Sequence, residues 1–216
     1  MSLFDKYKSW FFDFDGVILD SNKVKTDAFF EAAKKYGTPA AQALVDHHVS
    51  HGGISRFVKA EYLFNDILKR PAQAGEIDQF LTDFAKAVTK GLMTCAQTPG
   101  LNSLMSGPLK NIPCHVISGS MQTELRDLME KRDILGYFDN VFGSPDSKDH
   151  IFARELKNGT IQQPAVYIGD SLYDFEMADK YGLDFIFAYD WTEFSDWQNF
   201  FQDKDVLIVK NLAELA

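Results

Sequence analysis

The chain has 216 residues, a hydrophobic content of 45% and a formal net charge of -9, so it can bury a sizeable core. Its acidic residues are spread along the chain, which argues against a surface that neutralises nucleic-acid phosphates or anionic lipid. The sequence contains no apolar run of the roughly 20 residues that span a bilayer, and no signal-peptide pattern. We therefore expect a soluble cytoplasmic protein, a monomer or weak dimer, with no nucleic-acid and no membrane partner.

The first predicted strand covers residues 9–15, because aromatic side chains dominate it and Gly16 ends it. Asp13 and Asp15 then lie at the end of this strand. From residue 22 to about 92 the pattern is helical throughout: apolar side chains recur at helical spacing in 28–36, 54–68 and 76–90. Cys95 and Cys114, farther on, match no zinc pattern and no disulfide framework, so we predict free thiols.

After residue 100 short strands alternate with helices. We predict strands at 113–118, 140–143, 165–169, 185–188 and 206–209, and helices at about 121–132, 148–157 and 172–181. This alternation predicts a Rossmann-like α/β core with a mainly parallel sheet and helices on both faces. The core would comprise residues 1–20 and 95–216, and residues 21–94 would form an inserted α-helical domain. The aromatic-rich stretch 189–201 could pack on the core or on a partner.

Carboxylates follow two of the predicted strands. Asp13 and Asp15 are two residues apart on an extended segment and point to the same side, and Asp170 adds a carboxylate at another strand end. Carboxylates packed this closely repel one another unless a cation lies among them. A site with few protein oxygen ligands suits Mg2+, which keeps waters and shares phosphate oxygens with a substrate.

Three further groups are expected to converge on the same edge of the sheet. The Ser118 hydroxyl would donate a hydrogen bond to a phosphoryl group, and the Lys148 ammonium would supply positive charge. The Gly119 amide can approach the same group closely, because no side chain obstructs it. The expected ligand is therefore a small phosphorylated molecule.

These motifs, in this order and with a helical insertion after the first, resemble the haloacid dehalogenase-like superfamily. The likeness covers essentially the whole chain. It is specific to subfamily I, the phosphoglycolate phosphatase and β-phosphoglucomutase branch with a helical cap domain. The resemblance implies that Asp13 attacks phosphorus to give an aspartyl-phosphate, while Asp15 protonates the leaving oxygen and then deprotonates water. It also implies that Asp13, the Asp15 backbone carbonyl and Asp170 hold Mg2+, with Asp174 hydrogen-bonded just outside these ligands.

The residue two positions after the nucleophile narrows the chemistry that the resemblance implies. Dehalogenases lack an acid there, because halide leaves without a proton, and phosphonate hydrolases carry a small residue. Asp15 therefore favours P–O cleavage, in which an alkoxide leaving group needs a proton.

The segment 47–56 is the most distinctive part of the insertion. Its Gly53-Ile54-Ser55-Arg56 resembles the cap loop of β-phosphoglucomutase-type members, which implies that Gly53, Ser55 and Arg56 bind substrate, with Arg56 meeting an anionic or polyhydroxylated part. The alternative is that Ser55 caps the next helix and Arg56 is solvated. The imidazoles at 47 and 51 are four residues apart and could pair on a metal, but no third ligand is evident, which favours polar lining of the cap entrance.

Two departures from the family pattern favour a phosphatase over a mutase. Lys25 stands where mutase-like members carry a histidine, and Asp149 follows Lys148 where the family commonly has proline. We expect Mg2+-dependent hydrolysis of a small-molecule phosphomonoester, either a sugar phosphate or a small organic acid phosphate. The alternatives are a phosphosugar mutase of β-phosphoglucomutase type and a non-catalytic phospho-ligand binding module. The intact acidic and basic motifs argue against the last.

Overall fold

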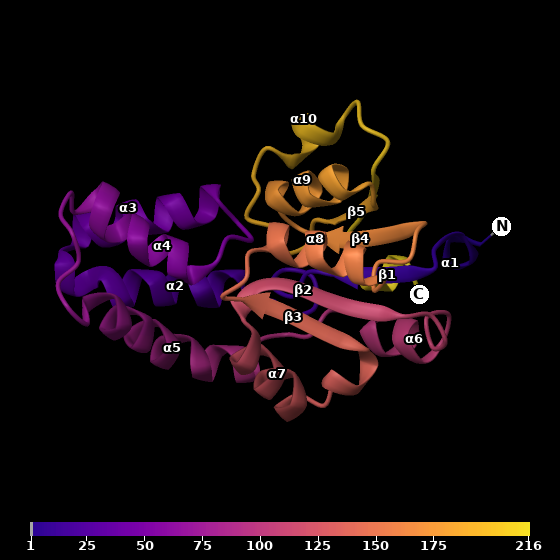
Figure 1. Cartoon of the computed structure of the whole chain (residues 1–216), viewed down its shortest axis with the longest axis horizontal. Helices are drawn as coiled ribbons and strands as arrows, with labels where there is room; N and C mark the ends of the chain where they lie inside the picture. The colour runs from indigo at the N-terminus through magenta and orange to yellow at the C-terminus, as the bar shows by residue number, and fades with distance from the viewer. Residues whose placement is uncertain (1) are drawn as a thin grey trace.

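Six parallel strands form the centre of the molecule in the computed structural model, which describes residues 2–216 (Figure 1). Their order across the sheet is β3-β2-β1-β4-β5-β6, and each neighbouring pair is parallel. The strands are β1 (Ser9–Phe12), β2 (Cys114–Met121), β3 (Asn140–Ser144), β4 (Ala165–Gly169), β5 (Asp184–Ala188) and β6 (Leu207–Val209). From β1 the chain proceeds to one side through β2 and β3, then crosses to β4 on the other side. The carboxyl ends of β1, β2 and β4 thus border a crevice of the kind in which such sheets bind ligands.

Side-chain alternation along β1 places an apolar core on each face of the sheet. Trp10 and Phe12 pack into one cluster and Phe11 into the other, as the period of two in a strand requires. The first face is covered by α6 (Leu101–Ser106) and α7 (Gln122–Lys131), and the second by α8 (Lys148–Asn158), α9 (Leu172–Tyr181) and α10 (Trp197–Phe201). Both faces are therefore buried, as an all-parallel sheet demands.

The inserted segment builds a helical body with a core of its own at one end of the sheet (Figure 1). It comprises α2 (Asn22–Ala33), the 3-10 turn η1 (Lys34–Tyr36), α3 (Thr38–Ser50), α4 (Arg56–Tyr62), the π-helical turn η2 (Leu63–Ile67) and α5 (Glu76–Thr94). Phe29, Phe64 and Phe80 are buried at its centre. The predicted α/β class with a helical insertion is confirmed. We propose 21–94 as the bounds of this cap domain, since its helices bury their apolar side chains mainly against one another.

Short elements complete the chain and refine the predicted boundaries. They are α1 (Leu3–Lys6), η3 (Leu135–Tyr137) and η4 (Leu212–Glu214). The first strand ends at Phe12 rather than residue 15, because the chain turns at Asp13 to Gly16, where Gly16 has φ +78°. In contrast, β2 continues to Met121, beyond the predicted end at 118.

The aromatic stretch 189–201 packs on the core of this chain. The Phe201 ring on α10 lies 4.7 Å from the Phe187 ring on β5, centroid to centroid. The Trp197 ring stacks on Tyr189 at 5.1 Å. These contacts belong to the apolar cluster that covers the second face of the sheet, which decides the choice between core and partner that the sequence left open.

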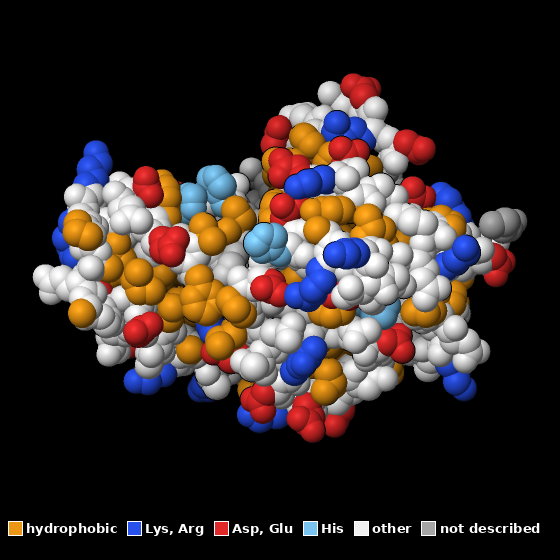
Figure 2. Space-filling model, in the orientation of Figure 1, with side chains coloured by type: hydrophobic (Ala, Val, Ile, Leu, Met, Phe, Trp, Pro, Cys, Tyr) orange, Lys and Arg blue, Asp and Glu red, His pale blue; other side chains and the backbone are white. Residues whose placement is uncertain are grey.

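The surface of the described residues carries mixed charge. Figure 2 shows Lys and Arg side chains interspersed with Asp and Glu side chains over the visible face. Within residues 2–216, no helix combines the length and the apolar character needed to cross a membrane.

Candidate active site

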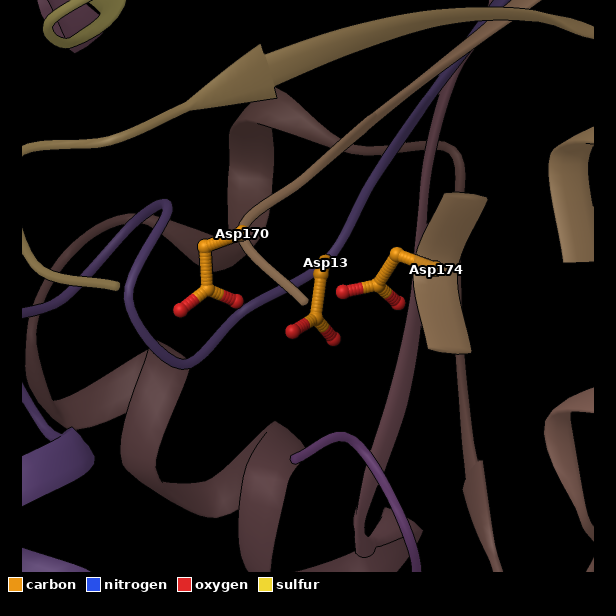
Figure 3. A group of neighbouring side chains, drawn as sticks. All are labelled: Asp13, Asp170 and Asp174. Atoms are coloured by element: carbon orange, nitrogen blue, oxygen red, sulfur yellow. The ribbon is translucent and has the colours of Figure 1, made fainter. Parts of the chain in front are cut away.

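Carboxylates from two neighbouring strands and one helix meet at the crevice. Asp13 directly follows β1, Asp170 directly follows β4, and Asp174 lies in the first turn of α9. One oxygen from each of these three buried side chains lies within 4.8 Å of the others. Figure 3 shows the three carboxylates side by side, with Asp13 between the other two. Because the strands are parallel and adjacent, their ends bring together residues far apart in the sequence.

Lys148 is the cation that contacts this cluster. Its Nζ donates to Asp13 Oδ1 at 2.8 Å and to Asp174 Oδ1 at 2.5 Å, and all three side chains are buried. Lys148 is the first residue of α8, and Ser147 caps that helix by accepting a hydrogen bond from the His150 amide. The helix start therefore fixes where the lysine stem leaves the backbone. The buried carboxylates raise the pKa of Lys148, although burial alone would lower it, so the lysine stays charged.

The Tyr167 hydroxyl on β4 contacts the same cluster. Its hydroxyl accepts from Lys148 Nζ at 3.0 Å, and it lies 2.8 Å from Asp174 Oδ1 and 3.0 Å from the Ile117 carbonyl oxygen. Burial and the neighbouring Asp174 raise the pKa of Tyr167 well above its ordinary value, so the hydroxyl keeps its proton as a donor. Asp174 Oδ2 accepts from the amide and hydroxyl of Ser171. Both oxygens of Asp174 are thus engaged by the protein, which suits a positioning role.

The cluster carries more negative than positive charge. Three carboxylates face one ammonium, and burial raises the pKa of both Asp13 and Asp170, with mutual repulsion adding to it. The charged forms therefore need a further positive group. A divalent cation among the oxygens meets that need, and an oxygen donor set of this size fits Mg2+.

Gly16 is required by the close approach of Asp170. A Cβ at position 16 would lie 2.2 Å from Asp170 Oδ2 and 2.5 Å from Asn22 Nδ2, and the positive φ disfavours any other residue. Asn22 Nδ2 in turn donates to Asp170 Oδ2 at 2.7 Å and to the Trp191 carbonyl oxygen at 2.8 Å. The turn after β1 and the first residue of α2 together orient the Asp170 carboxylate.

The Asp15 side chain lies outside this carboxylate cluster and has its own set of hydrogen-bond donors. Its Oδ2 accepts from Lys25 Nζ and, at 3.0 Å, from Ser120 Oγ, while its Oδ1 accepts from Ser21 Oγ at 2.6 Å. Burial alone would raise the pKa of Asp15, but Lys25 and the two hydroxyls outweigh burial and hold that pKa below its ordinary value. Asp15 is therefore ionised near neutral pH.

Ser118 and Gly119, which are predicted to contact a phosphoryl group, lie near the end of β2. Ser118 is fully buried, and its Oγ accepts from the Ser120 amide at 3.1 Å. Gly119 faces the cap: a Cβ there would lie 2.5 Å from the Gly53 carbonyl oxygen. Gly53 also approaches the carboxylate cluster, because a Cβ on it would lie 3.4 Å from Lys148 Nζ. Gly53 and Gly119 thus form one of the contacts between the cap loop and the core.

Arg56 does not reach into the cavity as a free cation. Its Nη2 donates to Glu124 Oε1 on α7 at 2.6 Å and contacts Met121 Sδ at 3.1 Å. Ser55 caps α4 by accepting from the Phe57 amide at 3.2 Å. The alternative expectation for Ser55 is thus what the structure shows, while Arg56 is buried in an ion pair between cap and core rather than solvated.

Two other sequence features are placed outside the carboxylate cluster. The His47 ring stacks between His51, at 4.1 Å, and Tyr62, at 3.6 Å between centroids. Cys95 and Cys114 are free thiols, as predicted.

A cavity of about 770 Å³ lies between the cap and the carboxyl ends of the strands. Asp13, Asp15 and Asp170 line its floor, and residues of α2, α3 and α4 line the opposite wall. Its cap-side wall includes the side chains of Lys25, His48, Arg56, Lys59 and Phe84. This volume suits a small ligand whose reactive end rests on the carboxylates.

Sequence reasoning missed several residues that shape the site. Tyr167 was predicted only as part of a strand, although a buried tyrosine hydroxyl needs a polar partner, and that was the available signal. The sequence indicates Asn22 only as the start of the helical region and indicates no role for Ser120, yet Asn22 donates to Asp170 and Ser120 donates to Asp15. Lys59 carried no signal, because its burial depends on the packing of α3 against α4.

Comparison with known proteins identifies the family of the chain. The family model described as haloacid dehalogenase-like hydrolase matches residues 10–188. No curated protein matches the chain.

Among solved structures, a β-phosphoglucomutase from Clostridium difficile superposes with a TM-score of 0.73 and 18% identity, covering 97% of this chain and 93% of the other. A predicted phosphatase from Clostridium acetobutylicum gives 0.74 and 18%, covering 97% and 96%. A HAD hydrolase of family IA, variant 3, from Entamoeba histolytica gives 0.73 and 16%, covering 97% and 95%. At these identities the structures share the fold. The family match extends over most of the sequence, and the chain therefore belongs to the haloacid dehalogenase-like hydrolases.

Proposed function

We propose that this protein is a Mg2+-dependent phosphatase that hydrolyses a small-molecule phosphomonoester, a sugar phosphate or a small organic acid phosphate, through an aspartyl-phosphate. One observation carries the proposal: Asp13, at the end of β1, shares Lys148 with Asp174, lies beside Asp170, and lines a cavity of about 770 Å³ between cap and core. This arrangement combines a carboxylate nucleophile with groups that offset the charge of a phosphoryl group.

Asp13 would act first. Its carboxylate oxygen forms a bond to phosphorus as the bond between phosphorus and the ester oxygen breaks, and the electron pair leaves with that oxygen. The Lys148 contact to Oδ1 supports this role, because it holds the carboxylate in one orientation. Lys148, Ser118 and the Gly119 amide would stabilise the charge that develops on the phosphoryl oxygens.

Asp15 would transfer protons in both halves of the reaction. The leaving oxygen needs a proton in the first half, and Asp15 would deliver it as the carboxylic acid, with a proton taken up from solvent, while the Lys25 ammonium holds the carboxylate that results. In the second half the ionised carboxylate takes a proton from water as that water attacks phosphorus. The low pKa of Asp15 suits this second role.

Asp13, Asp170 and the Asp15 backbone carbonyl would hold Mg2+, and Asp174 would orient them together with Lys148. When bound, the ion offsets the negative charge of the phosphoryl group and of the clustered carboxylates. The excess of buried carboxylates over ammonium groups supports this assignment.

A phosphosugar mutase is the second candidate, because the fold is shared with a β-phosphoglucomutase. Lys25 separates the two hypotheses. It holds Asp15 through an ion pair at the position where mutase-like members carry a histidine. Hydrolysis needs Asp15 to activate water, whereas a mutase must protect its phosphoenzyme from water.

The test is a phosphate-release screen over sugar phosphates, carboxylic acid phosphates and nucleotides, with Mg2+ and with a chelator. We expect Mg2+-dependent release from a subset of these compounds, and loss of release by roughly three orders of magnitude or more in Asp13→Asn. Isomerisation of a sugar phosphate that starts only when a sugar bisphosphate is added, with no phosphate release, would favour the mutase instead.

A further inference from the structure

Within the described residues, one buried lysine of the cap has no carboxylate partner. Lys59 on α4 is 1% exposed, and its Nζ lies 2.5 Å from His48 Nδ1 on α3. Burial and the neighbouring Lys59 lower the pKa of His48 to about 2, so His48 is neutral. Its Nδ1 therefore accepts the hydrogen bond from Lys59, and Nε2 carries the ring proton.

The other cap-side cations of the cavity wall are paired. Lys25 pairs with Asp15, and Arg56 pairs with Glu124. Among residues 2–216, Lys59 forms no ion pair with a carboxylate, and the only hydrogen bond of its Nζ is to a neutral ring. A buried charge without an opposite charge is costly, and such groups concentrate at functional sites.

The rings of Phe29 and His48 pack around Lys59 at the cavity wall. Its Nζ lies 5.5 Å from the centroid of the Phe29 ring, and the His48 ring lies 4.6 Å from the same ring. Both Lys59 and His48 line the cavity that contains Asp13 and Asp15. His48 Nε2 is buried and unpartnered within the described residues; the nearest carboxylate oxygen, Glu193 Oε2, lies 4.0 Å away. Lys59 Nζ and His48 Nε2 are thus donors available to a ligand in the cavity.

We propose that Lys59, oriented by His48, is a subsite for a carboxylate group carried by the substrate at the end remote from its phosphoryl group. The inference rests on the proposed function, since it assumes that the phosphoryl group occupies the carboxylate cluster. It assigns the substrate class: a phosphorylated carboxylic acid, short enough to lie between the floor and the cap wall.

The charge of this wall favours a monoanion over a second phosphate. Below its pKa of about 7, Lys59 supplies one unpaired positive charge, while Glu193 brings a negative charge close to His48. A phosphate dianion would meet the repulsion of Glu193 with only Lys59 to offset it, since Arg56 is engaged by Glu124. A carboxylate matches the single available charge.

The test is calorimetric binding, at pH 6, where Lys59 is charged, of carboxyalkylphosphonates of increasing chain length, each paired with its carboxamide, to the wild-type protein in Mg2+. Phosphonates of this kind lack the P–O ester bond, so binding is measured without turnover. At the chain length that spans the cavity, we expect the carboxylate to bind about 10–100-fold more tightly than the carboxamide. In Lys59→Met this ratio should fall to near one. Lys23→Met removes an exposed lysine of the cap that pairs with Asp27, and should keep the wild-type ratio.

The outcomes separate this subsite from the proposed function. Equal binding of carboxylates and carboxamides at every length overturns the subsite, as does a preference that persists in Lys59→Met. Tighter binding of alkyl bisphosphonates than of carboxylates, lost in Lys59→Met, also overturns the assignment to a carboxylic acid. If the preference is found but no phosphate ester of the series releases phosphate, then the subsite stands and the phosphatase proposal fails. Release without the preference leaves the phosphatase proposal standing and the subsite wrong.

Discussion

Tyr167 Oη lies 2.8 Å from Asp174 Oδ1, and both groups contact the Nζ of Lys148. Through this contact the central strand β4 and the first turn of α9 fix the ammonium that Asp13 shares. Asp13, the proposed nucleophile, is thus positioned by buried groups that do not themselves line the cavity.

Tyr167→Phe removes the hydroxyl and keeps the ring in the core. We expect about 1–2 kcal/mol lower free energy of unfolding, since Asp174 loses a buried hydrogen bond. We also expect about a tenfold or greater fall in kcat, because Lys148 and Asp174 lose their common partner. Tyr181→Phe is the matched control: its hydroxyl donates to Asp149 away from the cluster, and kcat should not change. An unaltered kcat in Tyr167→Phe would show that this support is dispensable.

Lys25→Met should destabilise the protein in a pH-dependent manner. The folded-state pKa of Asp15 is below its ordinary value of 3.8, so its ion pair contributes stability above that pH and loses it as the pH falls through the folded-state pKa. We predict a loss of about 1–3 kcal/mol at pH 7, measured by urea unfolding. The difference from wild type should shrink toward pH 3. A loss that is constant with pH would mean that the lysine stem, rather than the ion pair, provides the stability.

Lys59→Met should raise the free energy of unfolding, in contrast to Lys25→Met. Burial lowers the pKa of Lys59 from 10.5 to about 7, and repulsion from Lys25 adds to this shift. The carboxylates of Glu193 and Asp15 oppose the shift only in part. The unfolded chain therefore binds more protons than the folded protein between these values, and stability rises with pH across that window. We expect the variant to be more stable than wild type by about 1–4 kcal/mol at pH 6. The gain should diminish as the pH approaches 10.5.

This prediction separates a binding role for Lys59 from a structural one. If Lys59 serves packing alone, its replacement at pH 6 would lower the free energy of unfolding. A variant that is more stable and has lost the preference for a carboxylate fits the subsite.

Gly119→Ala should interfere with the seating of the cap on the core. A Cβ at this position would lie 2.5 Å from the Gly53 carbonyl oxygen, so the cap loop must move away. We expect kcat/KM to fall by about a hundredfold, because the cap no longer closes the cavity over the substrate. Gly136→Ala is the control, since a Cβ there meets nothing within 4 Å. If kcat/KM is retained in Gly119→Ala, the close approach of loop and strand has no part in catalysis.

Much of the fold follows from local patterns in the sequence. Aromatic residues before Asp13, and the regular alternation of short strands with helices after residue 100, are signals carried by neighbouring residues. The carboxylates and Lys148 could be predicted as candidates because each follows a strand, and parallel strands bring their ends to one edge. The end of β1 was predicted three residues too far, since Asp13 to Asp15 already belong to the turn.

The partners of the side chains could not be predicted in the same way. Arg56 and Glu124 are separated by 68 positions, and their ion pair depends on how the cap sits on α7. An arginine at the start of a helix gives no local indication that it will be buried. Likewise, the contact between Lys59 and His48 depends on the packing of two helices within the cap. Such contacts are tertiary, and one sequence carries no direct signal for them.

The most direct test of the account is acid quenching of the enzyme during turnover of a phosphomonoester in Mg2+, followed by mass spectrometry of its peptides. A phosphoryl adduct is expected on the peptide that contains Asp13, absent when substrate is omitted and absent in Asp13→Asn. Turnover with no adduct on that peptide, or phosphate release by Asp13→Asn at the wild-type rate, would contradict it.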